Sequence, residues 1–109
     1  MLKRATPQPG PNSLDAEQRM LAIDALERPG PTTRQALIDS LEPLTGHILH
    51  RAFNRPPAQP RSTVDLRRDF EAIIANALEQ ALLDFKINPS YHFGTYYSFR
   101  LRTMLPRLP

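Results

Sequence analysis

The clearest pattern of hydrophobic and polar positions lies between residues 65 and 85, where apolar side chains recur every three or four residues. The apolar positions are Leu66, Phe70, Ile73, Ile74, Ala77, Leu78, Ala81, Leu82 and Phe85. Because positions three and four apart share one face of a helix, this spacing predicts one long amphipathic helix. Thr63 is a candidate for its N-cap, and Ser62 with Asp65 resembles a capping box. Asn88-Pro89 is expected to stop the helix, because the residue before a proline is disfavoured in helical geometry.

Three further helices are predicted between proline-rich stretches, over residues 13–27, 33–53 and 95–105. Ser13 and Thr95 are the expected N-caps of the first and the last of these. Pro43 lies inside the middle one, so we expect either a kink or two helices that meet there. No segment alternates between apolar and polar residues at period two, so no sheet is predicted.

The chain has 109 residues, which is enough for one domain. The prolines of the first dozen residues predict a disordered arm over residues 1–12, followed by one domain over residues 13–109. We therefore expect an all-α protein, a small bundle of about four helices. No stretch has the roughly 20 apolar residues of a membrane span, and the N-terminus does not have the pattern of a secretory signal. A cytoplasmic protein without a membrane partner is expected.

Residues suited to catalysis or metal binding are sparse. The chain has no Cys, which excludes disulfides, thiolate metal sites and a Cys nucleophile. His47 and His50 have the spacing of a metal-binding pair, but no acidic ligand lies at a suitable spacing nearby. Glu71 and Glu79 fit a charged, solvated helix face better than a pair of catalytic carboxylates. We expect a protein that is not an enzyme and uses no metal or cofactor.

Charge and aromatic residues gather toward the C-terminus. The net charge is +3, a mild preference for polyanions, and from Phe85 onward the chain carries basic residues but no Asp or Glu. On charge alone, a solvated basic tail is the simpler interpretation. Five of the twelve residues from Tyr91 to Arg102 are aromatic. Such rings stack on unpaired bases while arginines hold phosphates, but the same spacing fits a helix that packs into the core.

The segment Asp69–Leu105 resembles the second conserved region of bacterial sigma factors of the sigma-70 family. The matching positions are Asp69, Ala77, Leu78, Ala81, Phe85, Pro89, Tyr91, Phe93, Thr95, Tyr96, Phe99, Leu101 and Arg102. Upstream, residues 36–53 are similar to the preceding sigma helix, with Pro43-Leu44 at the position of a Pro-Leu pair. The match runs without a gap through the aromatic segment and covers about two-thirds of the chain.

The resemblance implies two partners. The long helix is expected to dock on the clamp helices of the largest subunit of core RNA polymerase, through Asp69, Ala72 and Ile73. The aromatic segment is expected to open the minus-ten promoter element and bind its single strand. The residues that the resemblance assigns to DNA are Tyr91, Phe93, Thr95, Tyr96, Phe99, Arg100, Arg102 and Thr103.

Individual roles follow by position in the family. Tyr96 would stack on a flipped adenine, and Phe99 would be a wedge at the upstream edge of the bubble. Tyr91, Phe93 and Thr95 would line the single strand, with Arg102 near phosphate. Extrusion of a base costs a few kcal/mol, which aromatic stacking offsets.

The sequence also departs from the family. Ala72 and Ile73 replace polar residues that face the polymerase, Arg100 replaces the second of two paired tryptophans, and Thr103 replaces a glutamine that reads the duplex. We therefore expect a truncated sigma-like transcription initiation protein rather than a self-sufficient sigma factor. The alternative is a helical protein-interaction module, such as a phage or mobile-element accessory, that keeps the fold without promoter binding. The two differ in whether the rings of residues 91–99 face outward.

Overall fold

A computed structural model describes residues 11–53 and 62–105, and every regular element in these two ranges is an α-helix. The prediction of an all-α bundle is confirmed. The helices are α1 (Pro11–Glu27), α2 (Pro31–Ser40), α3 (Glu42–Phe53), α4 (Thr63–Asp69), α5 (Glu71–Ile87) and α6 (Phe93–Met104). None of them combines the length and the apolar character that a membrane crossing needs.

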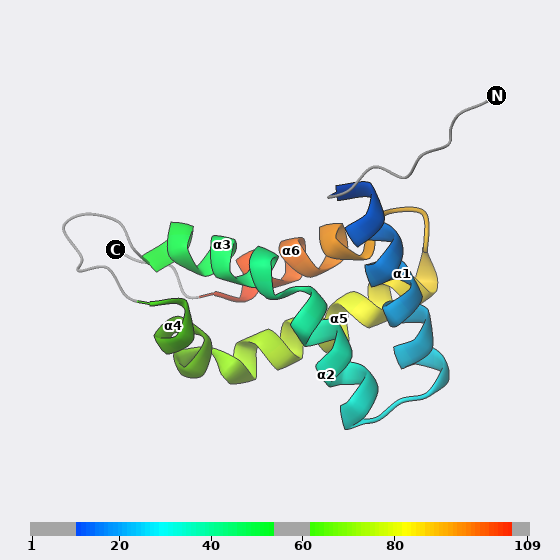
Figure 1. Cartoon of the computed structure of the whole chain (residues 1–109), viewed down its shortest axis with the longest axis horizontal. Helices are drawn as coiled ribbons and strands as arrows, with labels where there is room; N and C mark the ends of the chain where they lie inside the picture. Colours follow the sequence, from blue (N-terminus) through cyan, green and yellow to red (C-terminus); the bar gives the residue numbers. More distant parts are fainter. Residues whose placement is uncertain (1–10, 54–61, 106–109) are drawn as a thin grey trace.

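Helix α6 is the centre of the arrangement, because it packs against α1, α3 and α5 (Figure 1). Helices α1 and α2 form a hairpin beside it, and α4 packs against α3. A single core joins all six helices. Its largest fully buried side chains are Tyr97, Phe85, Phe93, Leu37, Leu41, Leu49, Leu66, Leu78, Leu82 and Leu101.

The turn between α1 and α2 depends on Gly30, whose φ of 153° is a backbone geometry that residues with a Cβ rarely adopt. The hydroxyl of Thr33 closes this turn by donating to the carbonyl oxygen of Arg28 at 2.8 Å. Pro31 occupies the first position of α2, where the missing N–H has no partner to lose. In this hairpin α1 packs against α2 and also against α5 and α6, at the end of the molecule where these two helices meet.

The second predicted helix is two helices. Helix α2 ends at Ser40 and α3 begins at Glu42, so the expectation that two helices meet near Pro43 is confirmed. Pro43 is the second residue of α3 and has no N–H for a bond to the preceding turn. The proline therefore divides the segment and is tolerated in the first turn of the new helix.

The long helix predicted over residues 65–85 is interrupted at Phe70, which has φ −115° and ψ 22°. No Gly or Pro marks the break in the sequence. The Phe70 ring stacks on Phe53 of α3 with centroids 4.6 Å apart, and Arg67 of α4 forms an ion pair with Glu42 at 2.9 Å. Packing against α3 therefore turns α4 away from the axis of α5.

Two predicted helix starts were wrong by about two residues, and the start of α4 is one of two candidates. Helix α1 begins at Pro11, before the predicted cap Ser13, and the rest of the predicted arm lies outside the described residues. Ser62 rather than Thr63 caps α4, as the pattern of Ser62 with Asp65 indicated, because its hydroxyl accepts from the backbone N–H of Asp65 at 3.1 Å. Helix α6 begins at Phe93 after His92, two residues before the predicted cap Thr95.

Candidate nucleic-acid interface

Helix α6 turns one face into the core and the other to solvent. Phe93, Tyr97 and Leu101, each four residues apart, have exposed fractions of 0%, 1% and 0%. The Phe93 ring lies edge-on to Phe85, with centroids 5.8 Å apart. The prediction that Phe93 lines a single strand is therefore corrected: a sealed ring is not available to a base, and Phe93 is a core residue.

Three other aromatic side chains remain accessible, and together with Thr95 we call them the aromatic face: Tyr91, Tyr96 and Phe99. The exposed fractions of Tyr91 and Phe99 are 60% and 62%. Tyr96 is half-buried and lies edge-on to Tyr91, with centroids 6.0 Å apart. Its hydroxyl donates to the carbonyl oxygen of Asn88. The condition set by the sequence, that the rings of residues 91–99 face outward, is therefore met at Tyr91 and Phe99 and partly met at Tyr96, but it fails at the two buried rings, Phe93 and Tyr97.

The aromatic face forms a pocket of about 520 Å³ with the end of α5. The residues from α5 and the following turn are Asp84, Ile87 and Asn88, and Arg100 completes the wall from α6. This volume lies within the range of about 300–1,000 Å³ that is common for ligand pockets. The pocket combines a mostly apolar wall with one ion pair.

That ion pair joins the two helices. Arg100 donates through Nε and Nη2 to the two carboxylate oxygens of Asp84, at 2.7 and 2.8 Å. These hydrogen bonds hold the pKa of Asp84 below its ordinary value and raise the pKa of Arg100. Arg100, which the sequence assigned to DNA, therefore reaches the pocket with its charge balanced by Asp84.

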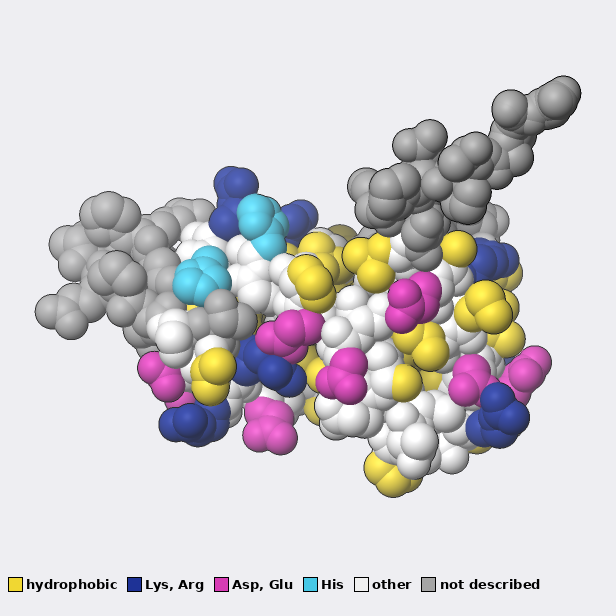
Figure 2. Space-filling model, in the orientation of Figure 1, with side chains coloured by type: hydrophobic (Ala, Val, Ile, Leu, Met, Phe, Trp, Pro, Cys, Tyr) yellow, Lys and Arg dark blue, Asp and Glu magenta, His cyan; other side chains and the backbone are white. Residues whose placement is uncertain are grey.

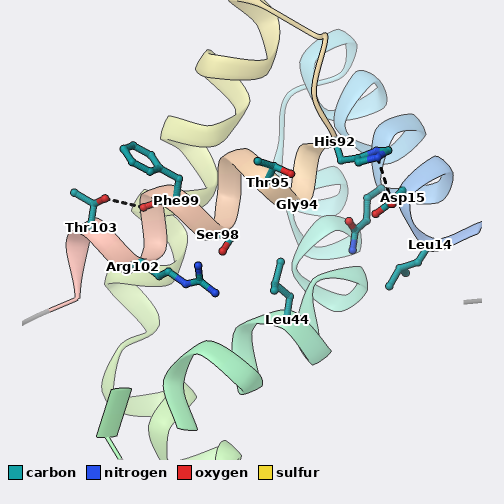
Figure 3. A pocket seen from close by; sticks show the side chains of 11 residues that line it. Leu14, Asp15, Leu44, His92, Gly94, Thr95, Ser98, Phe99, Arg102 and Thr103 are labelled. Atoms are coloured by element: carbon teal, nitrogen blue, oxygen red, sulfur yellow. Dashed lines mark hydrogen bonds and ion pairs between the residues drawn. The ribbon is translucent and has the colours of Figure 1, made fainter. Parts of the chain in front are cut away.

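Arg102 occupies the other flank of α6 and forms no ion pair with a described carboxylate. It lines a groove of about 1000 Å³ between α1, α3 and α6, together with Thr103. In Figure 3, Arg102 and Ser98 point across the groove toward Leu44, whereas Phe99 projects from the opposite side of α6. The groove closes at its far end where His92 and Asp15 lie 3.6 Å apart.

Arg19 of α1, which was not predicted from the sequence, also contacts this region. Its Nη1 donates to the carbonyl oxygen of Pro89 at 2.8 Å, and its Cζ lies 5.2 Å from the centroid of the Phe85 ring. Arg19 therefore contacts the turn between α5 and α6 and the ring beneath it. No local signal marks this contact, because 70 residues separate Arg19 from Pro89.

The residues predicted to dock on polymerase lie at the opposite end of α5 from the aromatic face. Asp69, the last residue of α4, and Ala72 are exposed, whereas Ile73 is half-buried against the core. At 1.5 Å per helical residue, about 16 Å of helix separates Ile73 from Asp84.

Acidic and basic side chains are interspersed on the face of the molecule that Figure 2 shows.

The two histidines whose spacing was weighed and set aside as a metal site lie on α3, where His47 is exposed and His50 is half-buried. Within residues 11–53 and 62–105, no group of three His, Cys, Asp or Glu side chains is placed to hold a metal ion. The candidate interface is therefore defined by aromatic rings and arginines.

The structure brings together most of the residues assigned to DNA. One pocket is lined by Tyr91, Thr95, Tyr96, Phe99 and Arg100, and the neighbouring groove is lined by Arg102 and Thr103 with Thr95 and Phe99.

The chain matches none of the protein-family models, curated proteins or solved structures with which it was compared.

Proposed function

We propose that this protein is a sigma-like transcription initiation protein that binds single-stranded promoter DNA on the aromatic face of α6. The observation that carries the proposal is the exposure of two large rings, Tyr91 and Phe99, on either side of the half-buried Tyr96. Exposed aromatic rings next to cations are the means by which proteins hold unpaired bases. Arg102, with no described carboxylate partner, provides the phosphate contact on the other flank.

The geometry gives each residue a distinct role in this proposal. Phe99 lines both the pocket and the groove, so a strand that crosses α6 passes its ring. Tyr96 offers only part of its ring because its hydroxyl is committed to Asn88. Stacking on Tyr91 and Phe99 therefore provides most of the base affinity.

Fluorescence anisotropy with a labelled single-stranded minus-ten oligonucleotide tests this proposal. Phe99→Ala and Tyr91→Ala are each expected to weaken binding by about 1–3 kcal/mol, the contribution of one stacked base. Met20→Ala is the matched control, because Met20 is 71% exposed but lies on α1 outside the pocket and the groove. Equal affinity of the wild type and both aromatic variants would reject the DNA-binding role.

The second contact in this proposal is with the clamp helices of core RNA polymerase, at the corner where α4 meets α5. Asp69→Ala is expected to reduce co-purification with core polymerase. Asp65→Ala is its matched control, an exposed carboxylate one turn earlier on α4. If both variants retain polymerase equally, the corner is not the docking site.

The alternative function, a helical protein-interaction module, is favoured by one observation. Ile87 has an exposed fraction of 83% and lines the same pocket as the aromatic rings. An exposed aliphatic side chain next to aromatics is suited to a protein partner, and base stacking does not use it. Ile87→Ala should leave oligonucleotide affinity unchanged under the DNA-binding proposal, and should weaken partner binding under the alternative.

A further inference from the structure

The turn between α5 and α6, residues 88–92, carries Tyr91, and two side chains from outside it bind its backbone. Arg19 of α1 donates to the carbonyl oxygen of Pro89 at 2.8 Å. The hydroxyl of Tyr96 donates to the carbonyl oxygen of Asn88. Consecutive carbonyl groups of the turn are therefore tied to two different helices.

Arg19 is itself fixed at a second point. Its guanidinium lies over the ring of Phe85, 5.2 Å from the centroid. Phe85 is buried and lies edge-on to Tyr96, with centroids 6.3 Å apart. A planar guanidinium presents its face to a ring while its edge donates hydrogen bonds, a combination that the lysine ammonium does not offer. Arg19 thus connects the turn to the ring that supports the aromatic face.

The turn has few other contacts: backbone hydrogen bonds join its ends to α5 and α6, and the exposed side chain of His92 lies 3.6 Å from Asp15 of α1. All five of its residues are exposed, and its internal side-chain contact is the bond from the Ser90 N–H to Asn88 Oδ1 at 3.2 Å. A segment with few buried contacts opens at low free-energy cost. The position of Tyr91 over Tyr96 therefore depends on these tethers, and of the side chains of α1, Arg19 binds the backbone before Tyr91 whereas Asp15 meets only the exposed side chain of His92.

We infer that Arg19 is a positioning residue that holds Tyr91 in its stacking geometry before a base arrives. This inference rests on the proposed function, and it adds α1 to the single-strand site. When a site is only partly in its binding-competent form, the apparent affinity falls by the competent fraction. Without Arg19, the turn adopts other geometries and the oligonucleotide must reorder it on binding.

The first test is oligonucleotide binding by Arg19→Met, which keeps the length of the side chain and removes its charge and donors. If a third of the molecules keep the competent turn, affinity falls about threefold. The loss should not exceed that of Tyr91→Ala, and it should vanish when Arg19→Met is combined with Tyr91→Ala. Arg28→Met is the matched control, because Arg28 pairs with Asp24 just past the end of α1 and does not touch the turn.

Salt dependence separates positioning from direct phosphate contact. Loss of one phosphate contact to a single strand reduces the slope of log K against log salt by about 0.7. A positioning role leaves this slope at the wild-type value in Arg19→Met. A reduced slope, or an undiminished loss of affinity in the Tyr91→Ala background, would overturn the inference.

The second test needs no ligand. In the free protein, nuclear Overhauser contacts between the Tyr91 and Tyr96 rings are expected in the wild type and in Arg28→Met, and expected to weaken in Arg19→Met. Unchanged contacts in Arg19→Met would overturn the inference even if binding falls. If the wild type binds no oligonucleotide, the proposed function fails, whereas this measurement still decides whether Arg19 positions Tyr91.

Discussion

On the inner flank of α6, Phe93 and Tyr97 are sealed among α1, α3 and α5, whereas on the outer flank Phe99 is 62% exposed. The residues are chemically alike and lie within seven positions of one another. What separates them is helical phase: positions 93, 97 and 101 face one way, and positions 95 and 99 face the other. An aromatic-rich segment therefore serves the core and a surface at the same time.

This difference explains why aromatic content alone did not assign the segment. Composition left core and nucleic-acid contact equally open, and the segment contains both buried and exposed rings. The resemblance placed Phe93 and Phe99 in the same interface, but the register of α6 buries only Phe93. Because α6 begins two residues earlier than the sequence predicted, Phe93 belongs to the helix and shares its buried face with Tyr97 and Leu101.

Removal of one ring from each flank of α6 tests the difference between the buried and the exposed flank most directly. Phe93→Ala is expected to lower the free energy of unfolding by about 3–5 kcal/mol, because it leaves a cavity against Phe85. Phe99→Ala should change it by no more than about 0.5 kcal/mol, as for most surface substitutions. Urea denaturation followed by circular dichroism measures both. Similar losses for the two variants would mean that Phe99 is a core residue in solution.

Local sequence signals predicted most of the fold. Periodicity, caps and prolines indicated helices over the segments that form α1 to α6, and Pro43 indicated the division between α2 and α3. The break at Phe70 was missed because its cause is a ring of α3, Phe53, brought there by tertiary packing. Propensity and periodicity describe neighbours along the chain and do not report such a contact.

The candidate site was predictable to a lesser degree. Tyr91 and Phe99 were named from the sequence, and both are exposed. The ion pair of Asp84 with Arg100 and the contact of Arg19 with Pro89 were not foreseen, because they join residues 16 and 70 positions apart in the sequence. Pairings of this kind follow from helix packing, which a single sequence does not display.

The burial of Tyr97 on the inner flank can be tested through the pH dependence of stability. Tyr97 shares a hydrogen bond of 2.7 Å with the hydroxyl of Thr45, and burial raises the pKa of Tyr97 from 10.0 to about 12. The folded state then holds this proton at pH values where the unfolded state has lost it. The stabilisation that the raised pKa of Tyr97 gives the folded state is complete below pH 10 and is lost as pH rises from 10 toward 12. The free energy of unfolding should fall by about 2–3 kcal/mol over that window.

Urea denaturation at several pH values, in parallel with Tyr97→Phe, isolates this effect from other groups that titrate at high pH. The variant leaves the Thr45 hydroxyl without its partner, so Tyr97→Phe combined with Thr45→Val provides a second reference. The wild type should lose more stability than both references above pH 10. If the free energy of unfolding falls equally with pH in the wild type and in both references, Tyr97 is not sealed from water.

The smallest expected effect concerns the exposed flank, where Asp84 balances the charge of Arg100. Asp84→Asn should release the guanidinium and raise oligonucleotide affinity about two- to threefold at low salt, the scale of an exposed charge interaction. Its salt slope should steepen by about 0.7 if the released Arg100 then contacts a phosphate. Glu79→Gln is the matched control, because it makes the same charge change on α5 but releases Arg34 of α2 instead. An equal gain of oligonucleotide affinity in the two variants would mean that only the net charge matters. A loss of affinity confined to Asp84→Asn would show that the intact ion pair shapes the pocket wall.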